Sequence, residues 1–125
     1  MSTIQSIHHK KVGTSGYVAY VVEETWDGEA CDNNYVKESG YLDSREYAQA
    51  WASLALTYFS DRTENGVEYH YTVMVEHRHW VELSYSYEGE LILDAEEQII
   101  DSQDGWVEDD GTAAGRFLWT EPEKP

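Results

Sequence analysis

Two histidines separated by one residue are the first feature that could do chemistry. His77 and His79 would project from the same side of a β-strand, with His70 and Glu82 close by in the sequence. Imidazole and carboxylate groups bind zinc in sets of three or four, with nitrogen ligands about 2.0–2.1 Å from the metal. A metal-dependent enzyme or small-ligand protein using these residues is therefore one hypothesis, and it requires the histidines to converge. We favour the alternative, in which the histidines occupy a strand edge and bind no metal.

The chain offers no clear nucleophile. Cys31 is the single cysteine, which excludes an internal disulfide, and the nearby carboxylates of Glu29 and Asp32 should raise the pKa of its thiol. The sequence contains no Gly-Lys-Ser/Thr phosphate loop, no GxGxxG and no GxSxG. Adjacent acids such as Glu23 and Glu24 are normally both ionised, whereas an acid/base pair needs one desolvated carboxyl group. We therefore expect no catalytic residue, no cofactor and no enzyme.

Negative charge is the dominant feature of the composition. Among 125 residues, 25 acids against 8 bases produce a formal net charge of −17. Residues 63–125 contain sixteen acids and three bases, so we expect the C-terminal half to present an acidic face. Such a surface repels nucleic acid and anionic lipid and attracts cations or basic protein surfaces. The expected partner is a basic, nucleic-acid-binding protein or protein complex, with no direct binding to nucleic acid or membrane.

We expect the acidic face to carry the binding site. Carboxylates on alternate strand residues lie about 6.6–7 Å apart, a spacing similar to that of phosphates along one nucleic-acid strand. Rim charges steer association, and buried aromatic side chains supply lasting affinity. The candidate partner-binding residues are the acids and two tryptophans Glu68, Glu76, Trp80, Glu82, Glu88, Glu90, Glu96, Glu97, Asp104, Trp106, Asp109 and Asp110.

One helix and several strands must position these side chains. Asp43 as N-cap and Glu46 three residues later predict a long helix over about 44–62, ended by Asn65-Gly66. Its core-facing side chains would be Tyr47, Trp51, Leu54, Ala55 and Tyr58. Before the helix we expect strands over 16–26 and 35–42, joined by a polar loop over 27–34.

The second half of the chain favours antiparallel strands. Strict alternation over 67–87 predicts strand, with Glu76 on the wet face and a break near 76–79 because the segment is long. Glu88-Gly89 predicts a hairpin turn. Residues 95–102 fit either a helical turn or a strand end, 101–111 read as an acidic loop, and 115–119 as a last strand. The predicted fold is a single α+β domain over 1–125: an antiparallel sheet of about four to six strands with one long helix on one face. Residues 1–15 would form a short edge strand or loose arm, and 120–125 a frayed tail.

In size, charge and lack of a catalytic motif, the chain resembles the small acidic inhibitors of phages and mobile elements. These include DNA-mimic, anti-restriction and anti-CRISPR proteins. The resemblance implies a non-enzymatic protein that blocks a basic, nucleic-acid-binding surface of its partner. An immunity protein that neutralises a cationic toxin or nuclease would use the same physics. The absence of an 18-residue apolar run and of an N-terminal apolar segment favours a cytoplasmic protein, and Tyr-rich strands with an exposed edge also permit a homodimer.

Overall fold

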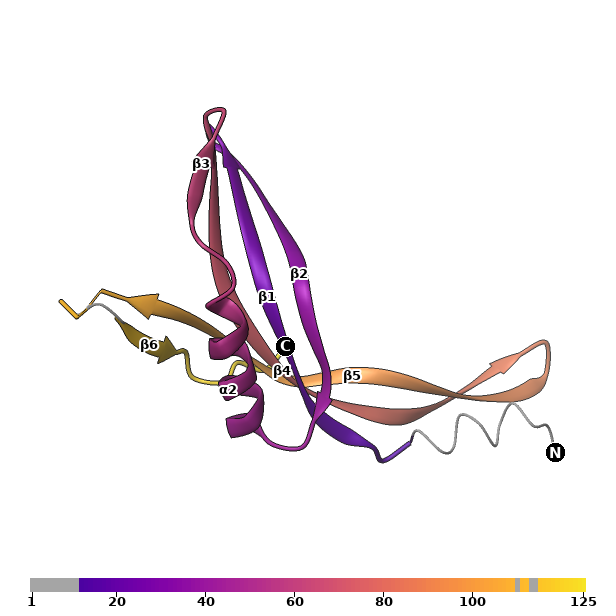
Figure 1. Ribbon diagram of the computed structural model, residues 1–125. Helices are drawn as coiled ribbons and strands as arrows, with labels where there is room; N and C mark the ends of the chain where they lie inside the picture. Colours follow the sequence, from indigo (N-terminus) through magenta and orange to yellow (C-terminus); the bar gives the residue numbers. More distant parts are fainter. Residues whose placement is uncertain (1–11, 110, 113–114) are drawn as a thin grey trace.

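A single antiparallel sheet organises the molecule. The computed structural model describes residues 12–109, 111–112 and 115–125. Its elements are β1 (Ser15–Asp27), β2 (Ala30–Leu42), α2 (Arg45–Leu56), β3 (Arg62–Glu64), β4 (Val67–Tyr87), β5 (Glu90–Glu108) and β6 (Arg116–Trp119). The strands form a six-stranded sheet in the order β2-β1-β4-β5-β6, with β3 paired to β4 (Figure 1). The sheet-dominated α+β class and the strand number agree with the prediction.

The core lies between α2 and the centre of β1 and β4. Alternate residues of these two strands, Ala19 and Val21 on β1 and Val73 and Val75 on β4, are fully buried. The helix faces them through Ala48, Ala52 and Ala55. Small side chains on the helix allow its backbone to lie close to the valines of the sheet. The core is therefore compact and confined to one face at the middle of the strands.

The helix is shorter than predicted, and the face it buries agrees with the prediction only at Ala55 and, in part, at Trp51. It has 12 residues rather than about 19, and its N-cap is Ser44, whose hydroxyl accepts a hydrogen bond from the Tyr47 N–H at 3.1 Å. Thr57 ends it by bonding the Leu54 carbonyl through its hydroxyl at 2.6 Å. The large residues predicted to face the core are mostly exposed, with Tyr47 at 60% and Tyr58, beyond the helix, at 78%. Ala48, Ala52 and Ala55 face the sheet instead, because only a small side chain fits against this part of the sheet.

The supposed helix stop is a hairpin turn. Asn65 and Gly66 both have positive φ, at 52° and 81°, which is the conformation that Asn-Gly favours between two antiparallel strands. They connect β3 to β4. Residues 62–64, which the sequence assigned to the helix or its end, are therefore paired with Val67–Tyr69.

Strand β4 runs through the whole molecule without the predicted break. It has 21 residues, and the predicted interruption near 76–79 is instead a register shift in its pairing with β5, between His77 and Arg78. An irregularity of this kind increases twist and bends a strand. Figure 1 shows β4 turning at this region from the upper arm into a second direction. Alternation continues through the bend, so sequence periodicity could not distinguish one bent strand from two.

Two segments predicted as loops are strands. Residues 27–34 contain only the turn at 28–29, and the rest extends β1 and β2. Residues 101–108 belong to β5 and pair with β4 and β6, so the ambiguous segment 95–102 is also strand. At least one face of each of these strands is open to solvent. The strands therefore carry charged side chains, which are also typical of loops.

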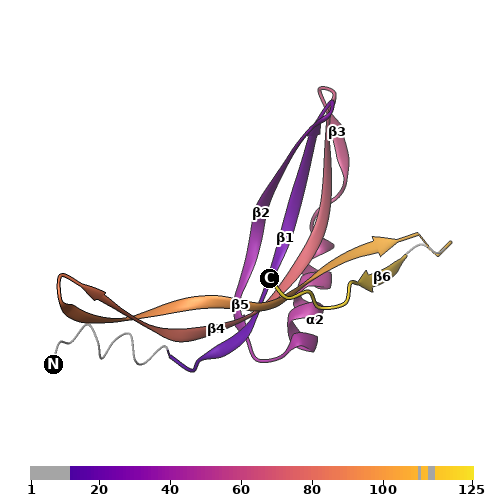
Figure 2. The ribbon, with the colours of Figure 1, turned by 180° about the vertical axis from the view of Figure 1, so that it is seen from behind.

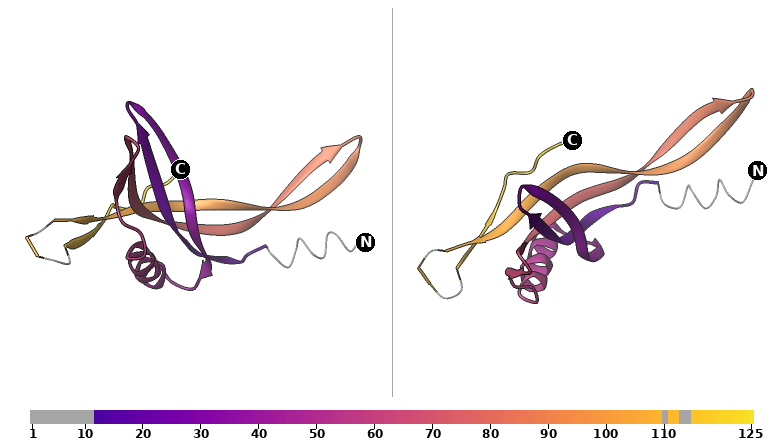
Figure 3. Two further views of the ribbon diagram at one scale, coloured as in Figure 1. Left: turned by 45° about the horizontal axis from the view of Figure 1, so that its top comes forward. Right: turned by 90° about the horizontal axis from the view of Figure 1, so that it is seen from above.

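Three arms project from the core. The upper arm contains residues 22–35 of β1 and β2, and residues 61–72 with β3 and the start of β4. The β4–β5 arm covers residues 80–97, that is, Trp80–Tyr87, the turn at Glu88-Gly89 and Glu90–Glu97. The β5–β6 arm contains Gly105–Glu108 and Arg116–Trp119. Figures 2 and 3 show that the last two arms leave the core on opposite sides.

The chain ends meet the sheet through backbone hydrogen bonds. Gly13 and Thr14 bond both backbone groups of Trp80, at 3.0 and 2.9 Å. At the other end, Glu123 pairs with Ser102 in an isolated bridge. The tail predicted over 120–125 is thus attached at Thr120, which bonds Asp104, and at Glu123. Most of the predicted N-terminal arm, residues 1–11, lies outside the described residues.

Candidate functional site

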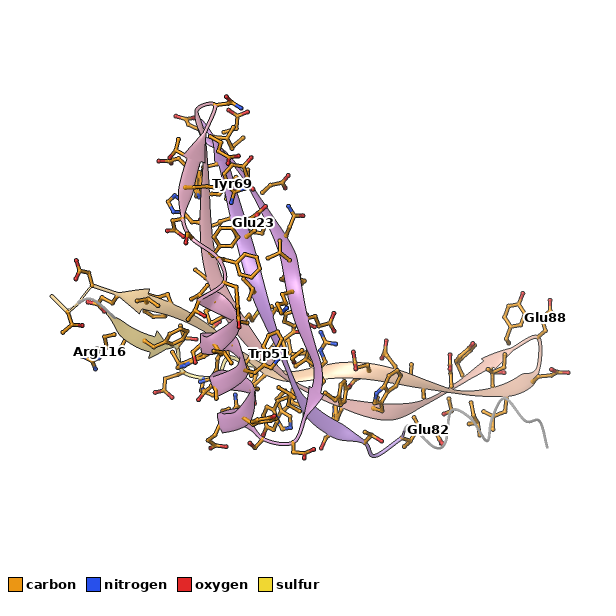
Figure 4. The ribbon with its side chains drawn as sticks, in the orientation of Figure 1. Glu23, Trp51, Tyr69, Glu82, Glu88 and Arg116 are labelled. Carbon is orange, nitrogen blue, oxygen red and sulfur yellow. The ribbon has the colours of Figure 1, made fainter. Side chains whose placement is uncertain are left out.

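Carboxylates cover all three arms instead of forming one C-terminal face. The upper arm combines eight acids with one arginine, and four of the eight come from residues 23–29 and one more from Asp32. The hairpin register brings these early residues beside Glu68, since Trp26 lies opposite it on the neighbouring strand. The β4–β5 arm contains six acids and no lysine or arginine. Figure 4 shows Glu23 and Glu88 on these two separate arms.

Sequence reasoning missed the acids of the first half of the chain. The predicted acidic face contained only residues after 63, whereas the predicted strand end and loop contain four further acids: Glu24, Asp27, Glu29 and Asp32. The signal that could have located them was Asp27-Gly28, a hairpin signal that folds 30–34 back along 23–27.

Glu76, predicted to be exposed, is buried. It retains 7% of its surface, and Arg78 donates hydrogen bonds to its Oε1 from Nε at 3.2 Å and Nη2 at 2.6 Å. Burial raises the pKa of Glu76 above its ordinary value, and the carboxylates of Glu97 and Glu38 add to this shift. The physical reason for the burial is Arg78, which supplies a counter-charge on the same face of β4.

Glu97 and Trp80 belong to the same contact group. Arg78 also donates to Glu97 Oε1 at 2.8 Å, and the Tyr41 hydroxyl donates to the other oxygen of Glu97. Burial raises the pKa of Tyr41, as does its hydrogen bond to Glu97, while a hydrogen bond with Trp80 lowers it. These side chains fasten the end of β2 to the base of the β4–β5 arm. Trp80 is accordingly half-buried within the protein.

The remaining predicted acids are exposed but lie apart. Glu82, Glu88, Glu90 and Glu96 extend along the β4–β5 arm, as Figure 4 shows for Glu82 and Glu88. Asp104, Glu68 and Asp109 are exposed elsewhere on the sheet. Asp110 lies outside the described residues.

The three strand histidines do not converge. His77 and His79 lie at alternate positions of β4, whereas His70 lies beside Asp61, seven residues or roughly 23 Å along the strand from His77. His77 stacks on Tyr17, with ring centroids 4.3 Å apart, and His70 Nδ1 lies 3.0 Å from Asp61 Oδ2. That hydrogen bond raises the pKa of His70. Among the described residues, no three His, Cys, Asp or Glu side chains are grouped to hold a metal ion.

Cys31 is exposed on the upper arm. Its thiol pKa is raised, as predicted, first by desolvation and then by the carboxylates of Glu24 and Asp32. The prediction had attributed this effect to Glu29 rather than to Glu24. The strand pairing explains the difference, since Cys31 faces the end of β1.

A polar network joins the helix to the sheet. Arg45 donates to both oxygens of Asp101, at 2.9 and 3.1 Å, and to the Gln103 side chain at 2.9 Å. Gln49 donates to the same Gln103 oxygen at 3.0 Å, and Gln103 in turn donates to the Thr120 carbonyl at 2.7 Å. Asp101 and Gln103 are 9% and 7% exposed. Every polar group here is paired within the protein, so the network positions α2 rather than binding a ligand.

Trp106 is the predicted partner-binding residue whose surroundings most resemble a binding site. Its side chain is 37% exposed and forms part of the walls of two hollows, of about 470 and 420 Å³. Volumes of this size fall within the range of ligand-binding pockets. We call them the helix-side hollow and the β2-side hollow. Thr72 also lines both, so the two hollows adjoin where the upper arm and the β5–β6 arm diverge.

Aromatic side chains and a carboxylate line the helix-side hollow. Phe59 packs on Tyr71 with ring centroids 5.0 Å apart, and Phe117 forms another part of the wall. Asp61 lies at this hollow and accepts a hydrogen bond from the Tyr71 backbone N–H at 3.1 Å. Burial raises the pKa of Tyr71, and so does the hydrogen bond that its hydroxyl donates to Glu23 at 2.7 Å.

The β2-side hollow has the same character. Tyr35 and Met74 contribute apolar surface, and Glu24 and Asp104 contribute carboxylates. Glu24 accepts a hydrogen bond from the Trp26 indole N–H at 2.7 Å. Both hollows therefore combine aromatic faces with negative charge, which suits the side chain of a lysine or arginine.

Gly105 allows the aromatic packing next to Trp106. A Cβ at this position would lie 2.8 Å from the Trp119 ring and 2.9 Å from that of Phe117. Those rings occupy the space because the glycine leaves it open. The Phe117 wall of the helix-side hollow thus depends on a residue that the sequence reading did not single out.

Comparisons of the chain with protein-family models, curated proteins and solved structures find no match. Among the described residues, no helix is long and apolar enough to cross a membrane.

Proposed function

We propose that this chain is a non-enzymatic acidic binding protein that blocks a basic, nucleic-acid-binding surface of a partner protein. The observation that carries the proposal is the pair of hollows at Trp106, each with aromatic walls and at least one carboxylate. Arginine and lysine are the residues that a nucleic-acid-binding surface presents. Two adjoining hollows could accept two such side chains from one partner.

Charge and anchoring would act at different stages of binding. The net charge of −17 attracts a basic surface from a distance and raises the association rate. Once docked, a cation over the face of Trp106 is stabilised by about 0.5–2 kcal/mol, depending on how far it is desolvated. The exposed carboxylates contribute little individually, because solvent screens them.

The proposed mode of action is steric and competitive. The arms spread carboxylates over extended strands, so the protein could occupy a groove built for nucleic acid. In this respect the proposal corresponds to inhibitors of the anti-restriction or anti-CRISPR type, whose targets are large cationic nucleases.

Inhibition of DNA binding tests the proposal. The full chain is titrated into purified restriction and CRISPR nucleases while their binding to labelled DNA is followed by fluorescence anisotropy. We expect stoichiometric loss of DNA binding for the target enzyme. Trp106→Ala should weaken inhibition by about tenfold or more, the size expected for an anchor residue.

Tyr47→Ala is the matched control. Tyr47 is a large aromatic residue, 60% exposed on the outer face of α2, and it lines neither hollow. Its variant should inhibit as well as the unmodified chain. The proposal fails if no nuclease releases its DNA, or if Trp106→Ala and Tyr47→Ala behave alike.

A further inference from the structure

Strand β2 forms one edge of the sheet. It pairs with β1 on one side, and no strand among the described residues pairs with its other side. Every residue from Ala30 to Glu38 is exposed. Figure 1 shows this edge running along the upper arm, on the side opposite β3. An edge of this kind presents backbone donors and acceptors with which a further strand can pair.

The pairing of β2 with β1 determines which backbone groups point outward. The turn at 28–29 has two residues, so Asp27 and Ala30 on either side of it form a hydrogen-bonded pair. Hydrogen-bonded and non-hydrogen-bonded pairs alternate along antiparallel strands, so Cys31 and Asn33 belong to pairs of the second kind. The backbone N–H and carbonyl groups of these two residues therefore point away from β1.

The edge is regular over Ala30–Tyr35. The register with β1 shifts by one residue at Val36, between Tyr35 and Lys37. An extra residue of this kind bends a strand and interrupts its pairing. A segment added beside β2 would therefore pair with Ala30–Tyr35 and would not continue past Val36.

This edge adjoins the β2-side hollow. Asn33 and Tyr35 form part of the wall, and Glu24, opposite Asn33 on β1, supplies a carboxylate. Tyr35 is 62% exposed and stacks on Tyr20, with ring centroids 4.7 Å apart. Neighbouring strands lie about 4.8 Å apart, so a residue added opposite Asn33 would lie two strand spacings from Glu24. An arginine or lysine side chain at that position can reach the carboxylate along the exposed Tyr35 ring.

Charge favours a cationic segment over a second copy of this chain. The upper arm combines eight acids with one arginine, and residues 30–35 include no lysine or arginine. Two copies paired through this edge would bring both sets of acids together, and like charges on neighbouring strands are destabilising. Cationic side chains on an added strand would instead meet Glu24 on one face of the sheet and Asp32 on the other.

We propose that the edge of β2 over Ala30–Tyr35 binds an extended, cationic segment of the partner as an antiparallel strand, with one arginine or lysine side chain in the β2-side hollow. The cationic nature of the partner rests on the proposed function, whereas the position of the added strand rests on the geometry of β2. Antiparallel pairing is the more stable arrangement per residue.

Methylated peptides test the proposal with the full chain. The parent peptide alternates arginine and valine and is long enough to pair with Ala30–Tyr35. When its arginine side chains lie on the hollow side, the backbone N–H groups of the arginines face Cys31 and Asn33, and those of the valines face away. Backbone N-methylation of the arginines should weaken binding by about tenfold or more, because several backbone hydrogen bonds are lost. Backbone N-methylation of the valines should leave binding unchanged, and isothermal titration calorimetry measures all three peptides.

A substitution in β2 tests the same edge from the side of the protein. Asn33→Pro removes an outward N–H, and proline is tolerated on an edge strand where its N–H would face solvent. This variant should weaken binding of the parent peptide. Asn33→Ala is the matched control, since it removes the same side chain but keeps the N–H, and it should bind the peptide like the unmodified chain. Circular dichroism verifies that both variants keep the sheet.

Equal binding of the two methylated peptides overturns the proposal, as does failure of the parent peptide to bind. Self-association in sedimentation velocity that Asn33→Pro abolishes also overturns it, because the edge would then belong to a second copy. Nuclease inhibition by the full chain is measured separately. If the chain releases DNA from a nuclease while both methylated peptides bind alike, the proposed function stands and the strand addition fails. If the peptides discriminate as expected while no nuclease is inhibited, the strand addition stands and the proposed function fails.

Discussion

Arg45 illustrates how much one side chain can organise in this protein. It begins α2, donates to Asp101 and Gln103 on β5, and lies over the Tyr17 ring of β1 with its guanidinium carbon 5.1 Å from the centroid. His77 approaches the same carboxylate, with Nδ1 3.7 Å from Asp101 Oδ2. Three strands and the helix are thereby joined through one cation.

Replacing that cation should destabilise the fold more than replacing an exposed one. Arg45→Ala leaves the carboxylate of Asp101 without its main partner, and the side chain of Asp101 is only 12% exposed. Removing one member of an enclosed ion pair costs about 3 kcal/mol or more. Urea unfolding measures the change, and Arg116→Ala on the β5–β6 arm, labelled in Figure 4, is the control, expected within about 0.5 kcal/mol of the unmodified chain. Equal effects of the two substitutions would show that the network contributes nothing to stability.

At the scale of elements, the helix contributes mainly by its alanine face. Ala48 and Ala52 are fully buried and Ala55 is 4% exposed, while Leu54 keeps 63% of its surface. The helix therefore packs by close approach and not by large interlocking side chains. Trp51, labelled in Figure 4, covers the margin of this contact without entering its centre.

We predict that enlarging an alanine of the helix lowers the free energy of unfolding more than truncating a leucine of the same helix. Ala52→Leu inserts a bulky group between the helix and the valines of β1 and β4, and overpacking of this kind costs about 1–3 kcal/mol. Leu54→Ala removes an exposed side chain and should change the free energy of unfolding by less than about 0.5 kcal/mol. Thermal or chemical denaturation of both variants checks the prediction. A larger loss from Leu54→Ala than from Ala52→Leu would mean that the helix packs through its other face.

At the scale of the whole molecule, the shape departs from that of a typical small domain. The 21 residues of β4 alone would span roughly 65–70 Å if fully extended, and those that pack in the core beneath the helix are Tyr71, Val73 and Val75, a short part of that length. The arms therefore expose strand surface and strand edges that a compact domain would bury. This exposure makes the two hollows at Trp106 available to a partner.

Small-angle X-ray scattering can measure this shape directly. A compact domain of 125 residues would have a radius of gyration of about 14 Å. The three arms should raise the measured value clearly above this figure and produce an extended distance distribution. A value near 14 Å would show that the arms fold back onto the core in solution.

Local sequence patterns predicted β1, β4 and β6, the hairpin at Glu88-Gly89 and the start of the helix to within a residue or two. These features depend on periodicity and turn chemistry, which act between near neighbours. The negative charge was likewise evident from composition.

Only the tertiary structure decided which surfaces are covered. The sequence could not show that Arg78 would enclose Glu76, that alanine would displace Tyr47 from the core, or that Trp106 would adjoin Tyr35 and Phe59. The packing of the helix and the neighbours of Trp106 depend on residues distant in the chain. Alternation of apolar and polar residues indicates that a strand has two different faces. The elements that pack on the sheet determine which of the two faces is buried.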